Sequence, residues 1–172
     1  MYIPVTDNDK PFYSEGFVVR FHKTDGTEWV ANFEPGWTDF KAIIELAGTT
    51  NLLVIASGTC YLMDTDQPKP LAVFGVGYST TFKTATGKII LQDQTDFTIV
   101  EPNGQFWHTE RISWDGFEEV ELKDNILTGL SYDPTNQINE WKEFSYNIDT
   151  KELIGGSYPK QPKTRQSRWK FW

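Results

Sequence analysis

Short alternating apolar segments, each closed by a tight-turn signal, most constrain what this chain can fold into. Asn103-Gly104 is the strongest of these signals, because this pair tolerates the positive φ angles that a two-residue hairpin turn requires. The alternation is clear in 17–23, where Phe17 and Val19 share one face of a strand. Further turn signals occur at Thr24-Asp25-Gly26, Ser57-Gly58, Gln94–Asp96, Asp124-Asn125 and Asp149–Lys151. The pattern predicts a mainly β chain of successive antiparallel hairpins.

Two arrangements of these hairpins fit the pattern. The favoured one is a curled antiparallel sheet or sandwich with one short helix on its flank. The alternative is a small propeller-like arrangement of successive hairpins. We favour the first because the hairpins follow one another at uneven intervals, whereas the blades of a propeller repeat at a regular period.

A single segment, 38–48, has the spacing of an amphipathic helix. Its apolar positions recur at i, i+3, i+4 and i+7, which places them on one helical face. These positions are Phe40, Ile43, Ile44 and Ala47. Thr38 or Asp39 is suited to cap the start of the helix, and Gly48 is suited to end it. We therefore expect one helix of about three turns that packs against the sheet.

The composition is typical of a single folded, soluble domain. A length of 172 residues suits one domain, and an aromatic content of 15% excludes a disordered chain. No apolar run approaches the roughly 20 residues of a membrane span, and no signal peptide is visible. The single cysteine cannot form an intramolecular disulfide, which favours a reducing compartment. These features predict a cytoplasmic protein with no membrane partner.

Charge is unevenly distributed along the chain. The whole chain carries −8 and the last 13 residues carry +5, so residues 1–159 carry −13. We therefore predict one β-rich domain over 1–159, followed by a basic, aromatic C-terminal tail over 160–172. This tail either folds back on the acidic domain, remains frayed or contacts a partner. A domain this acidic argues against nucleic acid as a partner and favours a basic protein.

No motif for catalysis or for cofactor binding stands out. The chain has no Gly-x-Ser-x-Gly elbow, no phosphate-binding loop and no Cys/His set at metal-ligand spacing. Cys60 has apolar neighbours, so it is expected to be a buried small side chain. His108 and Glu110 would point the same way along a strand, so a hydrolase that uses His108 and nearby carboxylates remains an alternative. The favoured prediction is a protein that is not an enzyme and uses no cofactor or metal.

An acidic cluster lies between residues 115 and 124, where five acids fall within ten residues. Val120 and Leu122 would point inward, while the acids between and around them would point outward. One interpretation is an edge strand protected from aggregation by charge. The other is a binding patch for a basic partner, extended by Trp141 and the acids that flank it. The predicted partner-binding residues are Trp114, Asp115, Glu118, Glu119, Glu121, Asp124, Glu140, Trp141 and Glu143.

Seven tryptophans also permit a carbohydrate-binding or small-ligand-binding protein. Trp29, Trp107 and Trp114 fall in or beside predicted strands, so they are expected to serve the core. Trp37 and Trp141 flank predicted turns and are the better candidates for exposure. Carbohydrate recognition therefore remains a second alternative.

Several short motifs support a resemblance to a known kind of protein. They are the stretches ISWDG (112–116), GLSYDP (129–134), EFSYNIDTKEL (143–153) and GGSY (155–158). With them, residues from about 50 to 158 resemble small uncharacterised bacterial β-rich proteins, of a kind similar to toxin-immunity proteins. The resemblance implies a β fold and a non-catalytic inhibitor that covers the active site of a basic toxin or effector. In such a mechanism, Trp141 or Trp114 would supply an apolar anchor.

Overall fold

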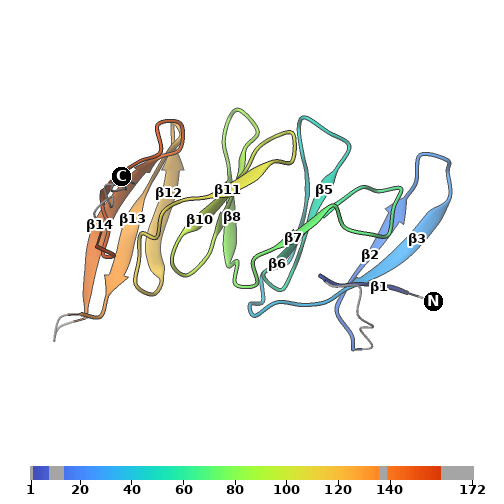
Figure 1. Ribbon diagram of the computed structural model, residues 1–172, viewed down its shortest axis with the longest axis horizontal. Coiled ribbons are helices and arrows are strands. Elements are labelled where there is room, and N and C mark those ends of the chain that lie inside the picture. Colours follow the sequence, from blue (N-terminus) through green and yellow to red (C-terminus); the bar gives the residue numbers. More distant parts are fainter. Residues whose placement is uncertain (1, 8–13, 136–138, 160–172) are drawn as a thin grey trace, which may run out of the picture.

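The computed structural model describes residues 2–7, 14–135 and 139–159, so the predicted tail over 160–172 lies outside the described residues. The described chain forms 15 strands in four separate sheets, which follow one another in sequence order (Figure 1). Sheet A contains β1 (Ile3–Val5), β2 (Phe17–His22) and β3 (Glu28–Phe33). In it, β2 and β3 form an antiparallel hairpin, and β1 pairs with β3 in parallel.

Sheets B, C and D are four-stranded antiparallel sheets in which each strand pairs with the next. Sheet B contains β4 (Ala42–Glu45), β5 (Leu52–Ala56), β6 (Thr59–Met63) and β7 (Ala72–Phe74). Sheet C contains β8 (Thr80–Lys83), β9 (Ile89–Gln92), β10 (Phe97–Val100) and β11 (Phe106–His108). Sheet D contains β12 (Phe117–Lys123), β13 (Ile126–Asp133), β14 (Glu140–Asn147) and β15 (Glu152–Gly155). The mainly β prediction of successive antiparallel hairpins is confirmed.

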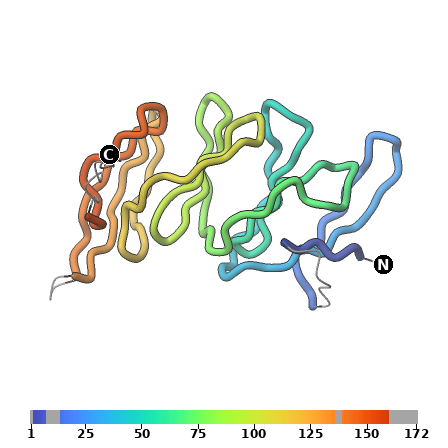
Figure 2. Tube along the Cα trace, in the orientation of Figure 1, coloured from blue at the N-terminus to red at the C-terminus, as the bar shows by residue number. Residues whose placement is uncertain are grey.

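The sheets stack face to face, with one apolar core between each neighbouring pair. In sheet B, Val54 and Tyr61 face sheet A, whereas Ile55 and Cys60 face sheet C. Both faces of β5 and β6 are therefore buried, which explains their nearly continuous apolar sequences. The chain runs along the stack from one end to the other (Figure 2). Sheets A and D consequently form the two ends, and each has only one face packed against a neighbouring sheet in the described chain.

The turns that join the strands match the sequence signals. Ser57 and Gly58 both have positive φ, of 50° and 95°, and join β5 to β6. Asp124 and Asn125, with φ of 48° and 62°, join β12 to β13 in the same way. Two successive residues with positive φ give the turn whose twist matches that of the hairpin strands.

The predicted helix over 38–48 is wrong, because β4 occupies this part of the chain and pairs with β5. Ala42 and Ile44 point into the core between sheets B and C, together with Leu46. Ile43 is half exposed between them. A short apolar run fits both periods, and here pairing with a buried neighbouring strand determines the structure.

Candidate protein-binding face

The candidate site is the outer face of sheet D, at the end of the stack. The inner face of this sheet packs on sheet C through side chains such as Leu127, Phe144 and Leu153. Side chains alternate along each strand, so the residues between these point away from the core. We call this outer surface the acidic face. It contains Glu118, Glu119, Glu121, Lys123, Ile126, Thr128, Leu130, Tyr132, Trp141, Glu143, Ser145, Asn147, Glu152 and Ile154.

A β-bulge in β12 places two successive glutamates on the acidic face. The register with β13 shifts between Glu118 and Glu121, and Glu119 has a φ of 51°. The bulge adds one residue to the outer side of the strand. Val120 and Leu122 therefore still reach the core, as the sequence predicts, while Glu118 and Glu119 are both exposed.

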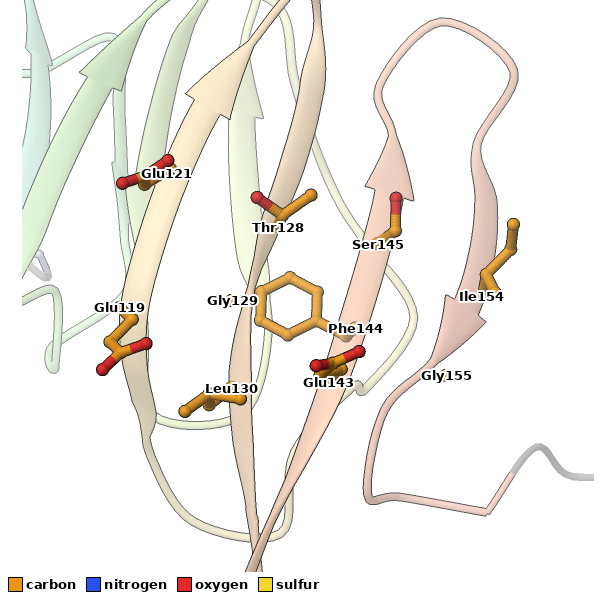
Figure 3. A pocket seen from close by; sticks show the side chains of 10 residues that line it. All are labelled: Glu119, Glu121, Thr128, Gly129, Leu130, Glu143, Phe144, Ser145, Ile154 and Gly155. Carbon is orange, nitrogen blue, oxygen red and sulfur yellow. The ribbon is translucent and has the colours of Figure 1, made fainter.

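Strand pairing brings acids from two separate strands together. Glu118 lies opposite Leu130 on β13, and Leu130 lies opposite Glu143 on β14. Neighbouring strands are about 4.8 Å apart, so the backbones of Glu118 and Glu143 are separated by about 10 Å. Figure 3 shows Glu119 and Glu121 on β12 and Glu143 on β14, on either side of β13. The predicted link between the 115–124 cluster and the segment around Trp141 is thus present in the sheet.

The acidic face is strongly negative because five carboxylates share it with one lysine. The carboxylates are those of Glu118, Glu119, Glu121, Glu143 and Glu152, and the lysine is Lys123. Lys142 lies between Trp141 and Glu143 in sequence, but it points to the opposite side and forms an ion pair with Asp133. The hydrogen bond from Lys142 lowers the pKa of Asp133 to about 2 and raises the pKa of Lys142.

A shallow depression of about 600 Å³ lies between these acids. Two apolar side chains also line it, Leu130 on β13 and Ile154 on β15, and Glu143 and Ser145 of β14 lie between them (Figure 3). Ile154 is 66% exposed. Gly155, at a φ of 75°, lies so near β14 that a Cβ there would be 2.3 Å from the carbonyl oxygen of Glu143, so this close approach requires glycine. The depression therefore combines apolar side chains with carboxylates.

An aromatic pair extends the apolar surface beyond the depression. Tyr132 and Trp141 lie opposite each other on β13 and β14, with ring centroids 5.2 Å apart. Trp141 is 39% exposed, as its position beside a turn predicts. A partly exposed aromatic side chain near a surface depression is typical of an anchor for a protein partner.

Some predicted site residues lie away from the acidic face. Trp114 is half-buried against Tyr158, with ring centroids 4.6 Å apart. Asp115 precedes β12, and Asp124 lies in the turn at the other end of that strand. Glu140 alternates with Trp141, so it points to the other side of β14. Only Glu118, Glu119, Glu121, Trp141 and Glu143 of the predicted residues share the acidic face.

Sequence reasoning missed the contribution of β13 and β15 to this face. Thr128 and Leu130 lie between the two acidic strands, and Ile154 lies on β15, opposite Ser145 of β14. The signal was the Asp124-Asn125 turn, because it fixes which residues of β13 lie opposite β12. Pairing the residues on the two sides of that turn, outward from it, would have placed Thr128 and Leu130 next to the glutamates.

His108 has a different partner from the one that its sequence suggests. Its Nδ1 lies 2.9 Å from the Thr98 hydroxyl and 3.9 Å from a carboxylate oxygen of Asp96, and no contact with Glu110 is seen. The Thr98 hydroxyl also shares a hydrogen bond of 2.7 Å with Tyr78, and both side chains are fully buried. Burial raises the pKa of Asp96. This network links the segment between β7 and β8 to sheet C, and the hydroxyl-bearing side chains of Thr98 and Tyr78 are both fully buried.

Other candidate reactive groups are also buried or take part in hydrogen bonds that stabilise turns. Cys60 is fully buried, and this burial raises the pKa of its thiol. Asp66 accepts hydrogen bonds from the backbone N–H and hydroxyl of Thr24, and Asp64 accepts one from the backbone N–H of Asp66. Within the described ranges, no group of three or more His, Cys, Asp or Glu side chains is arranged to hold a metal ion.

Comparison with known proteins adds no further identification. No family model, curated protein or solved structure matches this chain. In the part of the chain that the structure describes, no helix has the length and apolar character needed to cross a membrane.

Proposed function

We propose that the protein is a non-catalytic binding module that uses its acidic face to bind a basic protein partner. The observation that carries this proposal is the charge of that face, where five carboxylates accompany one lysine. Three of these carboxylates line a depression together with the apolar side chains of Leu130 and Ile154. A structural β-sheet needs charge at its edges to prevent aggregation. It does not need acids from different strands gathered around exposed apolar side chains, and this supports a role in binding.

The charged and the apolar side chains of the acidic face would have separate roles in the complex. The carboxylates would steer a cationic partner toward the face and increase the rate of association. Leu130, Trp141 and Ile154 would then lose their contact with water and slow dissociation. Because the residues of the acidic face lie on paired strands, their backbone is already fixed, and binding would cost little conformational entropy.

We further propose that this binding is inhibitory and that the partner is a toxin or effector with a cationic active site. An acidic sheet face would cover such a site and exclude its substrate. The resemblance of residues 50–158 to proteins similar to toxin-immunity proteins supports this part of the proposal. The single buried Cys60 is compatible with the cytoplasmic location that such a role requires.

Co-purification with matched charge variants tests the proposal. Tagged wild-type protein would be recovered from its source cells and its partner identified by mass spectrometry. The test variant carries Glu118→Lys, Glu119→Lys and Glu121→Lys. The control carries the same change in net charge at exposed acids outside sheet D, through Glu15→Lys, Glu45→Lys and Glu110→Lys.

We expect a basic partner to be recovered with the wild type and the control, but not with the acidic-face variant. Added back to the purified partner, the wild type should also suppress the partner's activity. Equal loss from both variants would mean that net charge alone is responsible. Recovery of the partner with the acidic-face variant would exclude the acidic face as the binding site.

A further inference from the structure

A second hollow lies at the other end of the stack, where sheet A meets sheet B. Its volume is about 490 Å³, and its lining includes Asp7, Glu34, Trp37, Tyr61 and Val76. Sheet D lies at the opposite end of the molecule (Figure 1). The hollow is therefore separate from the acidic face and needs its own explanation.

Trp37 is the most exposed large apolar side chain of the described chain, at 84%. Its exposure does not come from a loose loop, because its backbone N–H donates to the carbonyl oxygen of Val76 at 2.7 Å. The N–H groups of Gly36 and Thr38 donate in the same way to Ala56 and Ser57, both at 2.9 Å. Three successive bonded residues thus hold an indole ring in water, where it contributes little to the core.

The close approach of the backbone here requires glycine at position 36. A Cβ on Gly36 would lie 2.4 Å from the carbonyl oxygen of Val76 and 2.7 Å from that of Ser57. The sequence therefore uses a residue without a side chain to seat this segment against sheet B. Trp37 follows directly and is presented in a fixed position.

Two carboxylates line the hollow together with Trp37. The parallel pairing of β1 with β3 places Val5 opposite Phe33. Asp7 and Glu34 therefore both lie just beyond the same end of these two strands. The backbone N–H of Glu34 donates to the carbonyl oxygen of Val5 at 3.0 Å, which continues this alignment. Both acids are exposed.

The floor of the hollow is also defined. The Tyr61 hydroxyl donates to the carbonyl oxygen of Glu34 at 2.8 Å. Burial raises the pKa of Tyr61, and the negative charges of Glu34 and Asp7 raise it further. Both carboxylates line the same hollow, and no described residue that lines it is basic.

We propose that this hollow binds an arginine side chain of a partner polypeptide. An aromatic face attracts a cation, and a planar guanidinium can also stack on an indole ring. Its N–H groups can meanwhile donate to the carboxylates of Glu34 and Asp7. Arginine fits this combination better than lysine, because an ammonium group can neither stack nor donate in a planar fork. This proposal is independent of the function assigned to the acidic face.

Titration of the full-length protein with small probes tests the proposal. The Trp37 indole N–H signal would be followed by NMR while arginine methyl ester is added. Lysine methyl ester tests the preference for a guanidinium. Citrulline methyl ester, which replaces the guanidinium by a neutral urea group, tests the need for a charged side chain, and methyl glucoside tests carbohydrate binding. The variants are Trp37→Ala and Glu34→Gln, with Trp141→Ala as a control at the other end of the molecule.

We expect a saturable shift with arginine methyl ester, binding at least about threefold weaker for lysine methyl ester, and no saturation with citrulline methyl ester. Followed on neighbouring backbone amides, Trp37→Ala and Glu34→Gln should each weaken arginine binding at least about threefold. Trp141→Ala should leave it unchanged. Equal binding of citrulline methyl ester, tighter binding of methyl glucoside, or unchanged binding by Trp37→Ala would each overturn the proposal.

Discussion

Replacement of Phe97 by alanine should loosen sheet D without loosening sheet A. Phe97 on β10 is fully buried, and its ring centroid lies 4.8 Å from that of Phe117 and 5.9 Å from that of Phe144. These contacts join sheets C and D. Since each sheet of the stack packs only on its neighbours, a local loss should remain local, as it does in proteins built from stacked repeats.

The size of the effect follows from the burial. Removing a buried phenylalanine side chain costs about 3–5 kcal/mol. Each 1.4 kcal/mol is a factor of ten in an equilibrium constant. The opening of sheet D should therefore become about two to three and a half orders of magnitude more frequent.

Native-state amide hydrogen exchange measures this opening directly. In Phe97→Ala, amides of β13 and β14 should exchange faster by the factor given above, and amides of β2 and β3 by less than about tenfold. The matched variant is Phe33→Ala, which removes a fully buried ring between sheets A and B. It should show the opposite pattern. Equal acceleration of all four strands in either variant would refute the argument, because the stack would then open as one unit.

Three further outcomes follow from the structure. Asp133 has its pKa lowered to about 2 by the hydrogen bond from Lys142, so this carboxylate stabilises the fold above its ordinary pKa of 3.8 and loses that effect as the pH falls toward 2. Urea unfolding of Asp133→Asn should accordingly show a shallower loss of stability between pH 4 and 2 than the wild type, and parallel curves would contradict this. Gly36→Ala should cost about 3 kcal/mol by overpacking against backbone atoms, whereas Gly26→Ala, at a φ of 82° with open space around it, should cost about 1 kcal/mol; similar urea midpoints would show that the close contact at Gly36 relaxes. Removal of residues 160–172 changes the net charge from −8 to −13, so association with the basic partner should accelerate at low salt, and a slower rate would show that the tail aids binding.

The strands and turns were largely predictable from sequence because they depend on local chemistry. Turn residues such as Asn125 and Gly58 accept positive φ, and alternation marks the strands between them. The exception is 38–48, where a short apolar run was compatible with a helix and with a strand. The choice depends on β5, which lies outside that run and offers an edge with unpaired backbone groups.

The sequence also contains a signal for the stacking of the sheets, which the prediction did not use. Strands in the middle of the stack, such as Leu52–Ala56 and Phe97–Val100, are apolar at nearly every position because both of their faces are buried. Strands at the ends, such as Phe117–Lys123, alternate because one face meets water. This difference distinguishes a stack of sheets from a single two-layered sandwich.

The acidic face was only partly predictable for a physical reason. The cluster of glutamates in β12 is visible in the sequence, but the direction of each side chain depends on the bulge at Glu119. Lys142 points to the other side of the sheet because side chains alternate along β14, and there it pairs with the buried Asp133. The hollow beside Trp37 is built from four segments that are distant from one another in sequence, so no local sequence pattern predicts it.

The most direct test of the acidic face is the salt dependence of association with the partner recovered by co-purification. Stopped-flow rates would be measured from low to high ionic strength for the wild type, the acidic-face variant and the charge-matched control. We expect rates of the wild type and control to fall steeply with salt, and the acidic-face variant to bind slowly with little dependence on salt. Identical salt dependence in the control and the acidic-face variant would contradict the claim that this face recognises the partner.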